Sequence, residues 1–561
     1  MTATATTSRS VLRQAISGQR RHVVLASVLA AGHQGGEALV PVIIGLVIDQ
    51  AVTGGSVGSL VIWLAVLGVV FAGLSYSYRF AARAAEGASL RAAHDIRLAI
   101  SRRVLHPGGG AETGKLAGEL VNVGTSDAQR VGVINAALPF GIAALAGVLV
   151  SAVALLRMSL PLGLLVLLGT PPLLYLAHLI GKPLERRSEA EQERSAHASG
   201  IAVDLVAGLR VLKGIGAEST AIARYRETSQ NSLKATLRAA KAKAWHDGSL
   251  LALTGIFIAI VALVGGHLAS SGAISVGDLV AAVGLAQFLQ TPFLIFSWVN
   301  AELAQGRASA GRVAEVLSTP EAVRAGGGEL LLPAQGNVRL TAVSYGSLRG
   351  LDLDVPAGEL VGVVATDPAT ATDLLDCLGR AGDPTEGTVL VDGVDLSTVD
   401  PHLVRGVVLV AAHDADLFEG TLAENVLTGG ASHDEALVAS AADEVAAALP
   451  DGVETAVTER GRSLSGGQRQ RVALARALAA EAPVLVVHDP TTAVDTVTEA
   501  KIAAGLARLR QGRTTILVTT SPALLAVTDR VVVLDGGRVT GEGAHAELAH
   551  ERADYRSAVL S

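Results

Sequence analysis

The sequence is poor in cysteine, in aromatic residues and in charge. Cys377 is the only cysteine, so neither an intrachain disulfide framework nor a multi-cysteine metal site can form within one chain. Charged residues make up 17% of the chain, aromatic residues make up 3%, and the net charge is −7. Because nucleic-acid-binding domains favour a basic face, this balance gives no reason to expect nucleic acid as a partner.

Hydrophobic residues, by contrast, are abundant. They make up 50% of the 561 residues, and the mean hydropathy is +0.45. Soluble enzymes of this size are rarely so apolar, so we expect membrane spans, each about 20 residues long. Six such runs lie near 22–49, 58–82, 133–156, 160–181, 247–270 and 276–300. The first is too long for a signal-peptide core and lacks a small-residue cleavage site, so we expect it to be retained.

The charges of the loops predict which side of the membrane each loop faces. The segments between spans 2 and 3 and between spans 4 and 5 are long and basic, whereas the short loops near 50–57 and 271–275 have no lysine or arginine. The loop after span 3 has only Arg157. Basic segments stay in the cytoplasm, so we expect a multi-pass protein of the inner (cytoplasmic) membrane with both termini in the cytoplasm. The long segments continue as helices that turn near 108–125 and 206–220, a form suited to contact with a cytoplasmic domain.

After residue 305 the composition changes to that of a soluble α/β domain. We expect a linker over 306–336, where glycine and proline gather after residue 319, and a separate domain over 337–561. Short β-branched runs alternate there with helical segments, which predicts a largely parallel sheet. These runs are 360–364, 389–391, 407–410, 484–487, 515–518 and 531–534.

The most specific motif is LSGGQRQR, Leu464 to Arg471, followed by VALARAL and then by the apolar run VLVV. The motif predicts that Ser465 and the backbone of Gly466 and Gly467 lie at a helix N-terminus, where free N–H groups favour an anionic phosphate. Glycine lets the backbone approach such a ligand closely. The run resembles the signature motif of ABC transporters, and a chance glycine-rich helix cap would not match all eight residues.

The resemblance to exporter-type ABC half-transporters covers nearly the whole chain. Residues 418–425 match the F-x-G-T-x-x-E-N stretch of exporter cassettes, and 458–461 resemble the loop before the signature. Segments 113–130 and 208–226 resemble the regions that contain the intracellular coupling helices. The resemblance implies an α-helical six-span transmembrane domain (1–305) followed by an α/β P-loop-type nucleotide-binding domain. It also implies ATP and Mg²⁺ as cofactors, with each ATP held between the phosphate loop of one subunit and the signature of another.

The phosphate loop departs from the family pattern G-x-x-x-x-G-K-[ST]. Its eight positions are Ala365, Thr366, Asp367, Pro368, Ala369, Thr370, Ala371 and Thr372. Both fixed glycines and the lysine that reaches the β- and γ-phosphates are therefore lost. Pro368 also removes a backbone N–H, and Asp367 adds negative charge where the ligand is anionic. Only Thr372, at the Mg²⁺-binding hydroxyl position, is retained.

Four other positions of the nucleotide site also depart from the family. His488 and Asp489 stand where the family has Asp-Glu. An imidazole is a poor ligand for Mg²⁺, and Asp489 is one methylene shorter than the expected catalytic glutamate. Thr520 occupies the switch-histidine position, and His413 stands where a glutamine normally couples the metal site to the membrane domain.

Two further positions carry weaker expectations. Tyr345 lies where the family has an aromatic residue that stacks on adenine, but the segment is shortened, so stacking and ordinary packing stay equal alternatives. Asp495, in the loop TTAVD, is expected to lie across the dimer seam and to relay between the two nucleotide sites.

Polar residues inside the spans form a third group of candidates. His33 and Glu37 are spaced i, i+4 in the first span and so share a helix face. Polar groups at membrane depth tend to face a cavity, which suggests a substrate-binding or proton-linked role, with an interhelical hydrogen bond or a place near the headgroups as alternatives. The sixth span invites the same interpretation at Gln287, Gln290 and Asn300, and Trp63 and Trp298 are candidate interfacial anchors.

Loss of the chain's own catalytic elements beside an intact signature predicts a subunit of a heterodimer, rather than indiscriminate drift in an inactive protein. Leu464, Ser465, Gly466, Gly467 and Gln468 would act in trans on ATP held by a second half-transporter with intact Walker A and B motifs. The chain alone is expected to lack ATPase activity. The expected substrates are hydrophobic or amphiphilic small molecules, lipids or peptides.

Three alternatives follow from the same sequence. An importer of exporter-like fold would keep the architecture and reverse the direction. A non-pumping, ATP-regulated membrane subunit would keep the nucleotide-binding domain for control only. A homodimeric pump needs two competent phosphate loops, and the chemistry of Ala365 to Thr372 excludes it.

Overall fold

The computed structural model describes residues 7–330, 332–413, 416–426 and 433–560. The chain divides into two compact units, and each is described by itself. The membrane unit comprises residues 1–101 and 117–318, and the nucleotide unit comprises residues 102–116 and 319–561. Residues 102–116 therefore cluster with the second unit, whereas the sequence assigns them to the membrane domain.

Hydrogen bonds explain why this loop between the second and third spans belongs to the nucleotide unit. The Arg103 guanidinium donates to the carbonyl oxygens of Gly109 at 2.9 Å and Thr319 at 2.7 Å. The backbone N–H of Val323 donates to the Gly108 carbonyl oxygen at 3.1 Å. We call this contact between residues 103–110 and 319–323 the loop–linker clasp. Gly110 has a φ of +92°, and a Cβ there would lie 2.4 Å from the Pro320 carbonyl oxygen, so only glycine fits.

The membrane unit is helical. Its elements are α1 (Ser8–Gly18), α2 (Arg20–Val47), η1 (Ile48–Val52), α3 (Val57–Val104), α4 (Ala117–Asn122), η2 (Val123–Asp127), α5 (Ala128–Met158), α6 (Leu160–Ala207), α7 (Leu209–Gly214), α8 (Glu218–Ser270), α9 (Val276–Phe288) and α10 (Gln290–Ser318). In the part of the chain that the structure describes, six helical segments are long and apolar enough to cross a membrane, as the sequence predicts.

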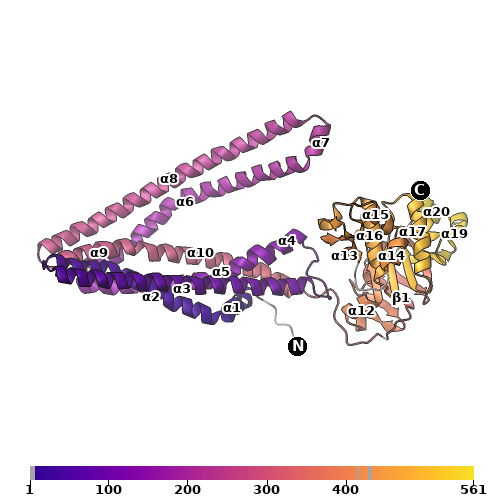
Figure 1. Ribbon diagram of the computed structural model, residues 1–561, viewed down its shortest axis with the longest axis horizontal. Coiled ribbons are helices and arrows are strands. Elements are labelled where there is room, and N and C mark those ends of the chain that lie inside the picture. The colour runs from indigo at the N-terminus through magenta and orange to yellow at the C-terminus, as the bar shows by residue number, and fades with distance from the viewer. Residues whose placement is uncertain (1–6, 331, 414–415, 427–432, 561) are drawn as a thin grey trace. The chain divides into compact units, whose positions relative to one another are not determined.

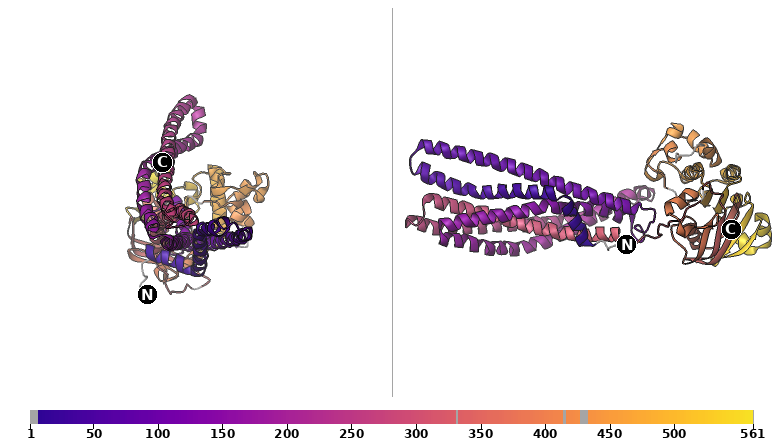
Figure 2. Two further views of the ribbon diagram at one scale, coloured as in Figure 1. Left: turned by 90° about the vertical axis from the view of Figure 1, so that its left-hand side faces the viewer. Right: turned by 90° about the horizontal axis from the view of Figure 1, so that it is seen from below.

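Small residues pack α2, α3 and α5 together. Ala26, Ala85 and Ala136 form one buried cluster, and Ala30, Ala81 and Ala143 form the next one along the helices. Alanine and glycine let helix backbones approach closely, which is how helices associate in membranes, where lipid is as apolar as leucine. Figure 2 shows these helices running side by side along the membrane unit.

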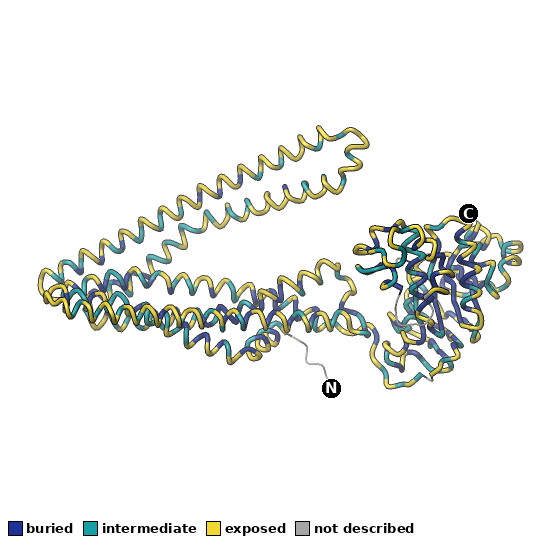
Figure 3. Tube along the Cα trace, in the orientation of Figure 1, coloured by how far each residue is buried: buried dark blue, intermediate teal, exposed yellow. Residues whose placement is uncertain are grey.

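A helical hairpin made by α6, α7 and α8 diverges from the other helices of its unit (Figure 1). Its distal part is mostly exposed (Figure 3). The exposed side chains include aliphatic ones: Val203 is 66% exposed, Val206 74%, Val211 65% and Ile215 71%. These apolar surfaces are not covered by the described chain.

The sequence prediction of a linker from residue 306 is wrong for residues 306–318, which continue α10 to Ser318. This stretch has no proline and is rich in helix-forming residues. Its inner face is buried at Ala310 and Val313, and Arg312 binds the buried Asp127 carboxylate through its Nε, 2.8 Å from Oδ2. Regular structure ends at Ser318, and glycine and proline gather only beyond it.

Among its described residues, the nucleotide unit contains two larger sheets, a small antiparallel pair of β7 and β8, and the surrounding helices. Its strands are β1 (Val338–Tyr345), β2 (Leu348–Val355), β3 (Leu360–Ala365), β4 (Glu386–Val391), β5 (Val394–Asp395), β6 (Val408–Ala411), β7 (Gly420–Thr421), β8 (Ala456–Val457), β9 (Val484–His488), β10 (Thr514–Val518), β11 (Arg530–Asp535) and β12 (Arg538–Gly543). Its α-helices are α11 (Pro368–Leu378), α12 (Pro401–Val407), α13 (Leu422–Val426), α14 (His433–Ala439), α15 (Ala442–Ala447), α16 (Gly466–Ala479), α17 (Thr496–Leu509), α18 (Pro522–Leu525), α19 (His545–Glu551) and α20 (Ala553–Leu560). Short helical turns lie at η3 (Leu396–Thr398), η4 (Gly452–Glu454) and η5 (Glu459–Gly461).

The larger sheet has the order β12-β11-β3-β10-β9-β6, and β12 alone pairs antiparallel. This agrees with the predicted, largely parallel sheet. The predicted run 389–391 belongs instead to a second sheet, β2-β1-β4-β5, which is antiparallel. A hydrophobic run of three residues carries no information about strand direction, so the sequence pattern could not separate the two sheets.

Candidate functional site

Four predicted site positions follow the carboxyl ends of adjacent parallel strands. The register pairs Val518 of β10 with both Val363 of β3 and His488 of β9, so these three strands end at one edge of the sheet. β6 ends beside β9 at the same edge, with Ala411 paired to Val487. Ligands of open α/β sheets bind outside this edge. The phosphate-loop segment, His413, the pair His488–Asp489 and Thr520 all come from it.

The phosphate-loop segment does not form an open loop. Helix α11 begins at Pro368, in the middle of the motif, and Asp367 is its N-cap. The Asp367 Oδ1 accepts a hydrogen bond from the N–H of Ala369 at 3.1 Å, and its carbonyl oxygen accepts from the N–H groups of Thr370 and Ala371. In a phosphate loop such N–H groups cradle the ligand. Here the chain supplies its own carboxylate at the helix N-terminus, where the dipole favours an anion.

Three other side chains of this segment contact the protein itself, which leaves them unsuited to bind a ligand. Ala371 is 5% exposed and packs in the hydrophobic core. Thr372, the retained Mg²⁺-binding position, donates its hydroxyl to the Pro368 carbonyl oxygen at 3.1 Å. Thr366 binds the end of β11 through a 2.6 Å hydrogen bond to Asp535. The residues present do not fit a triphosphate with its magnesium ion.

The β1–β2 turn closes over α11. The N–H of Ser347 donates to Asp373 Oδ2 at 2.6 Å, and its hydroxyl contacts both that oxygen at 2.7 Å and the hydroxyl oxygen of Thr370 at 3.2 Å. Neither Ser347 nor Asp373 is part of the phosphate-loop motif, and sequence reasoning did not single them out. The shortened segment between β1 and β2 is the signal that could have pointed to this contact.

Tyr345 is half-buried against the core of the nucleotide unit. Its hydroxyl oxygen lies so close to Gly382 that a Cβ there would be 2.3 Å away. Burial, with Asp376 nearby, raises the pKa of the Tyr345 phenol. Of the two alternatives left by the sequence, these contacts favour packing over adenine stacking.

Two imidazoles occupy the region of the expected metal ligand. The His413 and His488 rings lie 5.9 Å apart, and His488 Nε2 is 3.7 Å from Asp489 Oδ2. His413 Nδ1 lies 3.3 Å from the carbonyl oxygen of Asp489. The described part of the chain holds no group of three His, Cys, Asp or Glu side chains that could bind a metal. This arrangement offers a hard cation one carboxylate and two nitrogen-bearing rings, whereas Mg²⁺ prefers oxygen.

The signature segment forms a helix N-terminus with a capping box. Ser465 is the N-cap of α16 and forms a capping box with Gln468: Ser465 N–H donates to Gln468 Oε1 at 2.8 Å, and Gln468 N–H donates to Ser465 Oγ at 3.3 Å. Leu464 is buried beneath the turn, whereas Ser465 is exposed. The N–H groups of Gly466 and Gly467 have no intrahelical acceptor, because the first turn of a helix provides none. This helix end remains open to an anion.

The loop that follows β9 is hydrogen-bonded to α16. Gln470 donates through Nε2 to the Thr492 hydroxyl at 2.6 Å and accepts from the Ala493 N–H at 2.9 Å. Asp495, further along this loop, caps α17 by accepting from Val497 and Thr498, and these hydrogen bonds, led by the one from the Thr498 backbone, lower the pKa of its carboxyl. Thr520 is exposed after β10. Sequence reasoning missed the role of Gln470, although it lies within the recognised motif.

Three cavities among the described residues of the membrane unit bear on the predicted polar positions and on the substrate. One of about 360 Å³ is lined by both His33 and Glu37, together with Trp298. A second, of about 490 Å³, includes Gln290, whose Oε1 accepts from the Thr254 hydroxyl at 3.2 Å. The predicted polar positions of the first and sixth spans therefore partly converge on cavities, whereas Gln287 and Asn300 remain unassigned.

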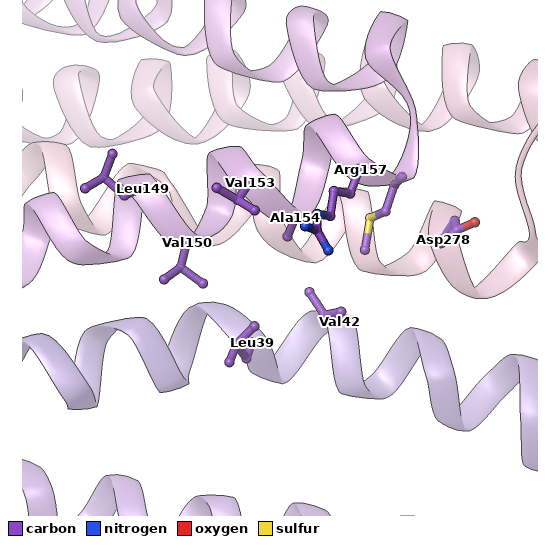
Figure 4. Close-up of a pocket in the computed structure, with 9 residues that line it drawn as sticks. Leu39, Val42, Leu149, Val150, Val153, Ala154, Arg157 and Asp278 are labelled. Atoms are coloured by element: carbon purple, nitrogen blue, oxygen red, sulfur yellow. The ribbon is translucent and has the colours of Figure 1, made fainter.

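The third cavity, of about 730 Å³, lies between α2 and α5 (Figure 4). Its walls are aliphatic, and its two charged residues, Arg157 and Asp278, lie toward the same end. Asp278 Oδ2 also accepts from the Ser275 N–H at 3.2 Å and so caps α9. The shape, with an apolar body and a polar end, is suited to an amphiphile.

Comparison with known proteins identifies the family of the chain. Residues 23–293 match the ABC transporter transmembrane region, and residues 348–492 match the ABC transporter family. The chain is 32% identical over 531 residues to a multidrug efflux ATP-binding/permease protein of Mycobacterium bovis, which covers 92% of this chain and 44% of that protein. It is 30% identical over 482 residues to the ATP-dependent lipid A-core flippase of Burkholderia orbicola, covering 82% of this chain and 79% of the flippase.

The chain thus spans less than half the length of the mycobacterial relative and most of the length of the flippase. Among solved structures, a bacterial Atm1-family ABC exporter with ATP bound is similar in fold, with a TM-score of 0.72, 23% identity and 98% coverage of both chains.

Proposed function

The chain belongs to the ABC transporter family as a half-transporter of the exporter type, and from this premise we propose that it is one subunit of a heterodimeric ATP-driven exporter. Its signature residues act in trans on ATP held by a second subunit with intact Walker A and B motifs. One observation carries the proposal. Asp367 fills the helix end of this chain's own phosphate loop, while Ser465 leaves the N-terminus of α16 open.

The N-terminus of α16 supplies the groups that act on the ATP held by the second subunit. Ser465 Oγ accepts from Gln468, so its own proton is available to donate to a phosphate oxygen. The N–H groups of Gly466 and Gly467 point out of the same helix end, and the helix dipole adds a favourable field for negative charge. ATP supplies the energy of the cycle, and Mg²⁺ belongs with the partner's phosphate loop and acidic residues. This chain contributes charge stabilisation and positioning.

The membrane unit supports the need for a second subunit. The α6–α8 hairpin carries aliphatic side chains that are two-thirds exposed or more, including Val203 and Val206. Exposed apolar surface of this kind beyond the membrane marks an interaction site. The mycobacterial relative is more than twice as long as the matched segment and has room for a second unit of this size. Both features fit an exporter built from two non-identical halves.

The substrate class follows from the relatives and from the cavities. One relative is named as a multidrug efflux protein and another as a lipid A-core flippase. Both names support a hydrophobic or amphiphilic substrate, and the cavity of about 730 Å³ between α2 and α5 has aliphatic walls with Arg157 at one end. We place the protein in the inner membrane with both termini in the cytoplasm, because the long basic segments between its spans favour that side.

ATP hydrolysis by the isolated chain tests the proposal. The purified chain is expected to show only background hydrolysis, and co-purification with its partner half-transporter is expected to restore turnover. Gln468→Ala in this chain should then reduce turnover in the pair, although Gln468 does not contact the chain's own nucleotide. Brisk Mg-ATP hydrolysis by the chain alone would contradict the proposal. Inside-out vesicles test direction: ATP-dependent accumulation supports export, and ATP-dependent uptake into whole cells would indicate an importer.

A further inference from the structure

The cavity that contains His33 and Glu37 has an unusual chemistry for the interior of a membrane unit. It is formed by α2, α3, α5 and α10. Its lining combines one carboxylate, from Glu37, with three aromatic rings, from Tyr78, Phe140 and Trp298. At about 360 Å³, it is within the range of about 300 to 1,000 Å³ that holds drug-sized ligands.

The Glu37 carboxylate lacks a full countercharge. It lies near the middle of the candidate span Arg20–Val52 and is 45% exposed. Its Oε2 accepts from Gln34 Nε2 at 3.2 Å and is 3.9 Å from His33 Nε2. Across the described ranges, no lysine or arginine nitrogen is paired with it.

His33 also contacts the backbone of α3. Its Nδ1 lies 2.9 Å from the carbonyl oxygen of Leu74, which can only accept, so Nδ1 carries the proton. In the neutral ring Nε2 is then an acceptor, and it cannot donate to Glu37. An ionised carboxylate at membrane depth is costly unless a cation approaches it.

The aromatic residues supply the second part of a cation site. Tyr78 is 50% exposed and Trp298 is 41% exposed. The Phe140 and Trp298 rings meet edge to face with centroids 6.2 Å apart, and the Tyr78 and His33 rings are 5.2 Å apart. Aromatic faces attract cations within about 6 Å of the ring centroid, and they also cover the apolar part of an organic ligand.

We propose that this cavity binds a lipophilic organic cation, held by Glu37 and by the faces of Tyr78 and Trp298. The proposal deepens the exporter function and rests on it, because the bound cation would be the transported substrate. A neutral or anionic amphiphile would bring no positive charge to the Glu37 carboxylate. The site therefore selects by charge as well as by hydrophobicity.

Tryptophan fluorescence offers a direct test, since the chain has three tryptophans and one of them lines the cavity. Trp63→Phe and Trp245→Phe leave Trp298 as the sole reporter. The full-length chain, in lipid nanodiscs, is titrated with tetraphenylphosphonium and with tetraphenylborate, which have nearly the same shape and opposite charge. We expect saturable quenching by the cation alone. Equal saturable quenching by both ions, or by neither, would overturn the proposal without any further variant.

Substitutions then test whether Glu37 supplies the negative charge that binds the cation. Glu37→Gln should weaken cation binding roughly tenfold, because it removes the negative charge and leaves the aromatic faces in place. Glu37→Asp keeps the charge and should retain the cation preference. Glu302→Gln, a change of the same type on α10, is the matched control and should bind as the parent does. Unchanged affinity in Glu37→Gln, or equal loss in Glu302→Gln, would count against the site.

The ATPase activity of the co-purified pair, measured in the same preparation, keeps the two proposals separate. If hydrolysis depends on the partner but the cavity shows no cation preference, the cation site is wrong and the heterodimer stands. If the cation binds with the expected preference but the isolated chain hydrolyses ATP, the heterodimer is wrong and the cation site stands.

Discussion

Gly467 lies directly against the backbone of Ala493: a Cβ on Gly467 would be only 2.4 Å from the Ala493 carbonyl oxygen. Gly466 meets the same residue more loosely, with an ordinary 3.4 Å contact to the Ala493 Cβ. The two glycines of the signature therefore differ in their structural need. Gly467 is required for packing between α16 and the loop after β9, whereas Gly466 has room for a side chain within this chain.

Because of this difference, substitutions of the two signature glycines should affect stability and ATP turnover differently. Gly466→Ala should leave thermal unfolding of the purified chain almost unchanged and should lower ATP turnover of the heterodimer roughly tenfold, since small misplacements at a reacting phosphate are costly. Gly467→Ala should lower the unfolding free energy by about 1 to 3 kcal/mol, as overpacking does. Thermal unfolding and turnover of both variants provide the check, and equal stability of the two would refute the packing argument.

Ala371 replaces the family lysine at a position that is buried here. Ala371→Lys places an ammonium in the hydrophobic core and should lower the unfolding free energy by at least about 2 kcal/mol. It should not create ATPase activity, because Asp367 still caps α11 and His488 still stands where a metal ligand is needed. Thr372→Lys, at the exposed neighbour, is the control and should change stability by only about 0.5 kcal/mol. Gain of hydrolysis in Ala371→Lys alone would contradict this account.

Cys377 reports on the same helix. It is 2% exposed in α11, and burial, with Asp376 and Asp373 nearby, raises the pKa of its thiol to about 12. The thiol should therefore stay protonated and unreactive at pH 8, and a thiol reagent should label it only when the nucleotide unit opens.

The labelling rate of Cys377 with and without Mg-ATP tests whether the phosphate-loop segment of this chain binds nucleotide. Mg-ATP should not slow labelling of the isolated chain, because its own phosphate loop does not fit the ligand. A ligand present at about 100 times its Kd would slow such opening about 100-fold. Denaturant, as the positive control, should raise the labelling rate. Strong protection by Mg-ATP would show that the degenerate site binds nucleotide.

The loop–linker clasp can be opened with one methyl group. Gly110→Ala adds a Cβ 2.4 Å from the Pro320 carbonyl oxygen, so the clasp should separate and trypsin should cut after Arg324 several-fold faster. Gly114→Ala is the matched control: Gly114 also has a positive φ, +72°, but a Cβ there meets nothing within 4 Å. Equal cleavage of both variants would attribute the effect to backbone strain instead of the clasp.

The sequence predicted those parts of the fold that depend on periodic or well-marked patterns. The six spans follow from apolar length, and the helix N-terminus at Ser465 follows from a motif whose capping box is local. The predicted linker began too early because it was placed where the apolar run of the sixth span ends, although residues 306–318 are rich in helix-forming residues. Their helix is held by tertiary contacts, such as Arg312 with Asp127, that composition does not show.

The phosphate-loop segment shows a different limit. Comparison with the family pattern identifies which groups are lost, but it does not say what replaces them. The early start of α11 depends on Asp367 acting as N-cap and Pro368 at the first helical position, both local preferences that could have been recognised. The contact of Ser347 with Asp373 joins residues from separate elements, so the shortened β1–β2 segment could indicate a tight turn there but not its partner on α11.

The loop–linker clasp changes how many times the polypeptide passes between its two units. The backbone crosses at residues 101/102, 116/117 and 318/319. Each crossing lies within or next to a helix of the membrane unit: the first in α3, the second at the start of α4 and the third at the end of α10. The nucleotide unit is therefore covalently continuous with three helices of the membrane unit, where a simple carboxy-terminal fusion would join it to one.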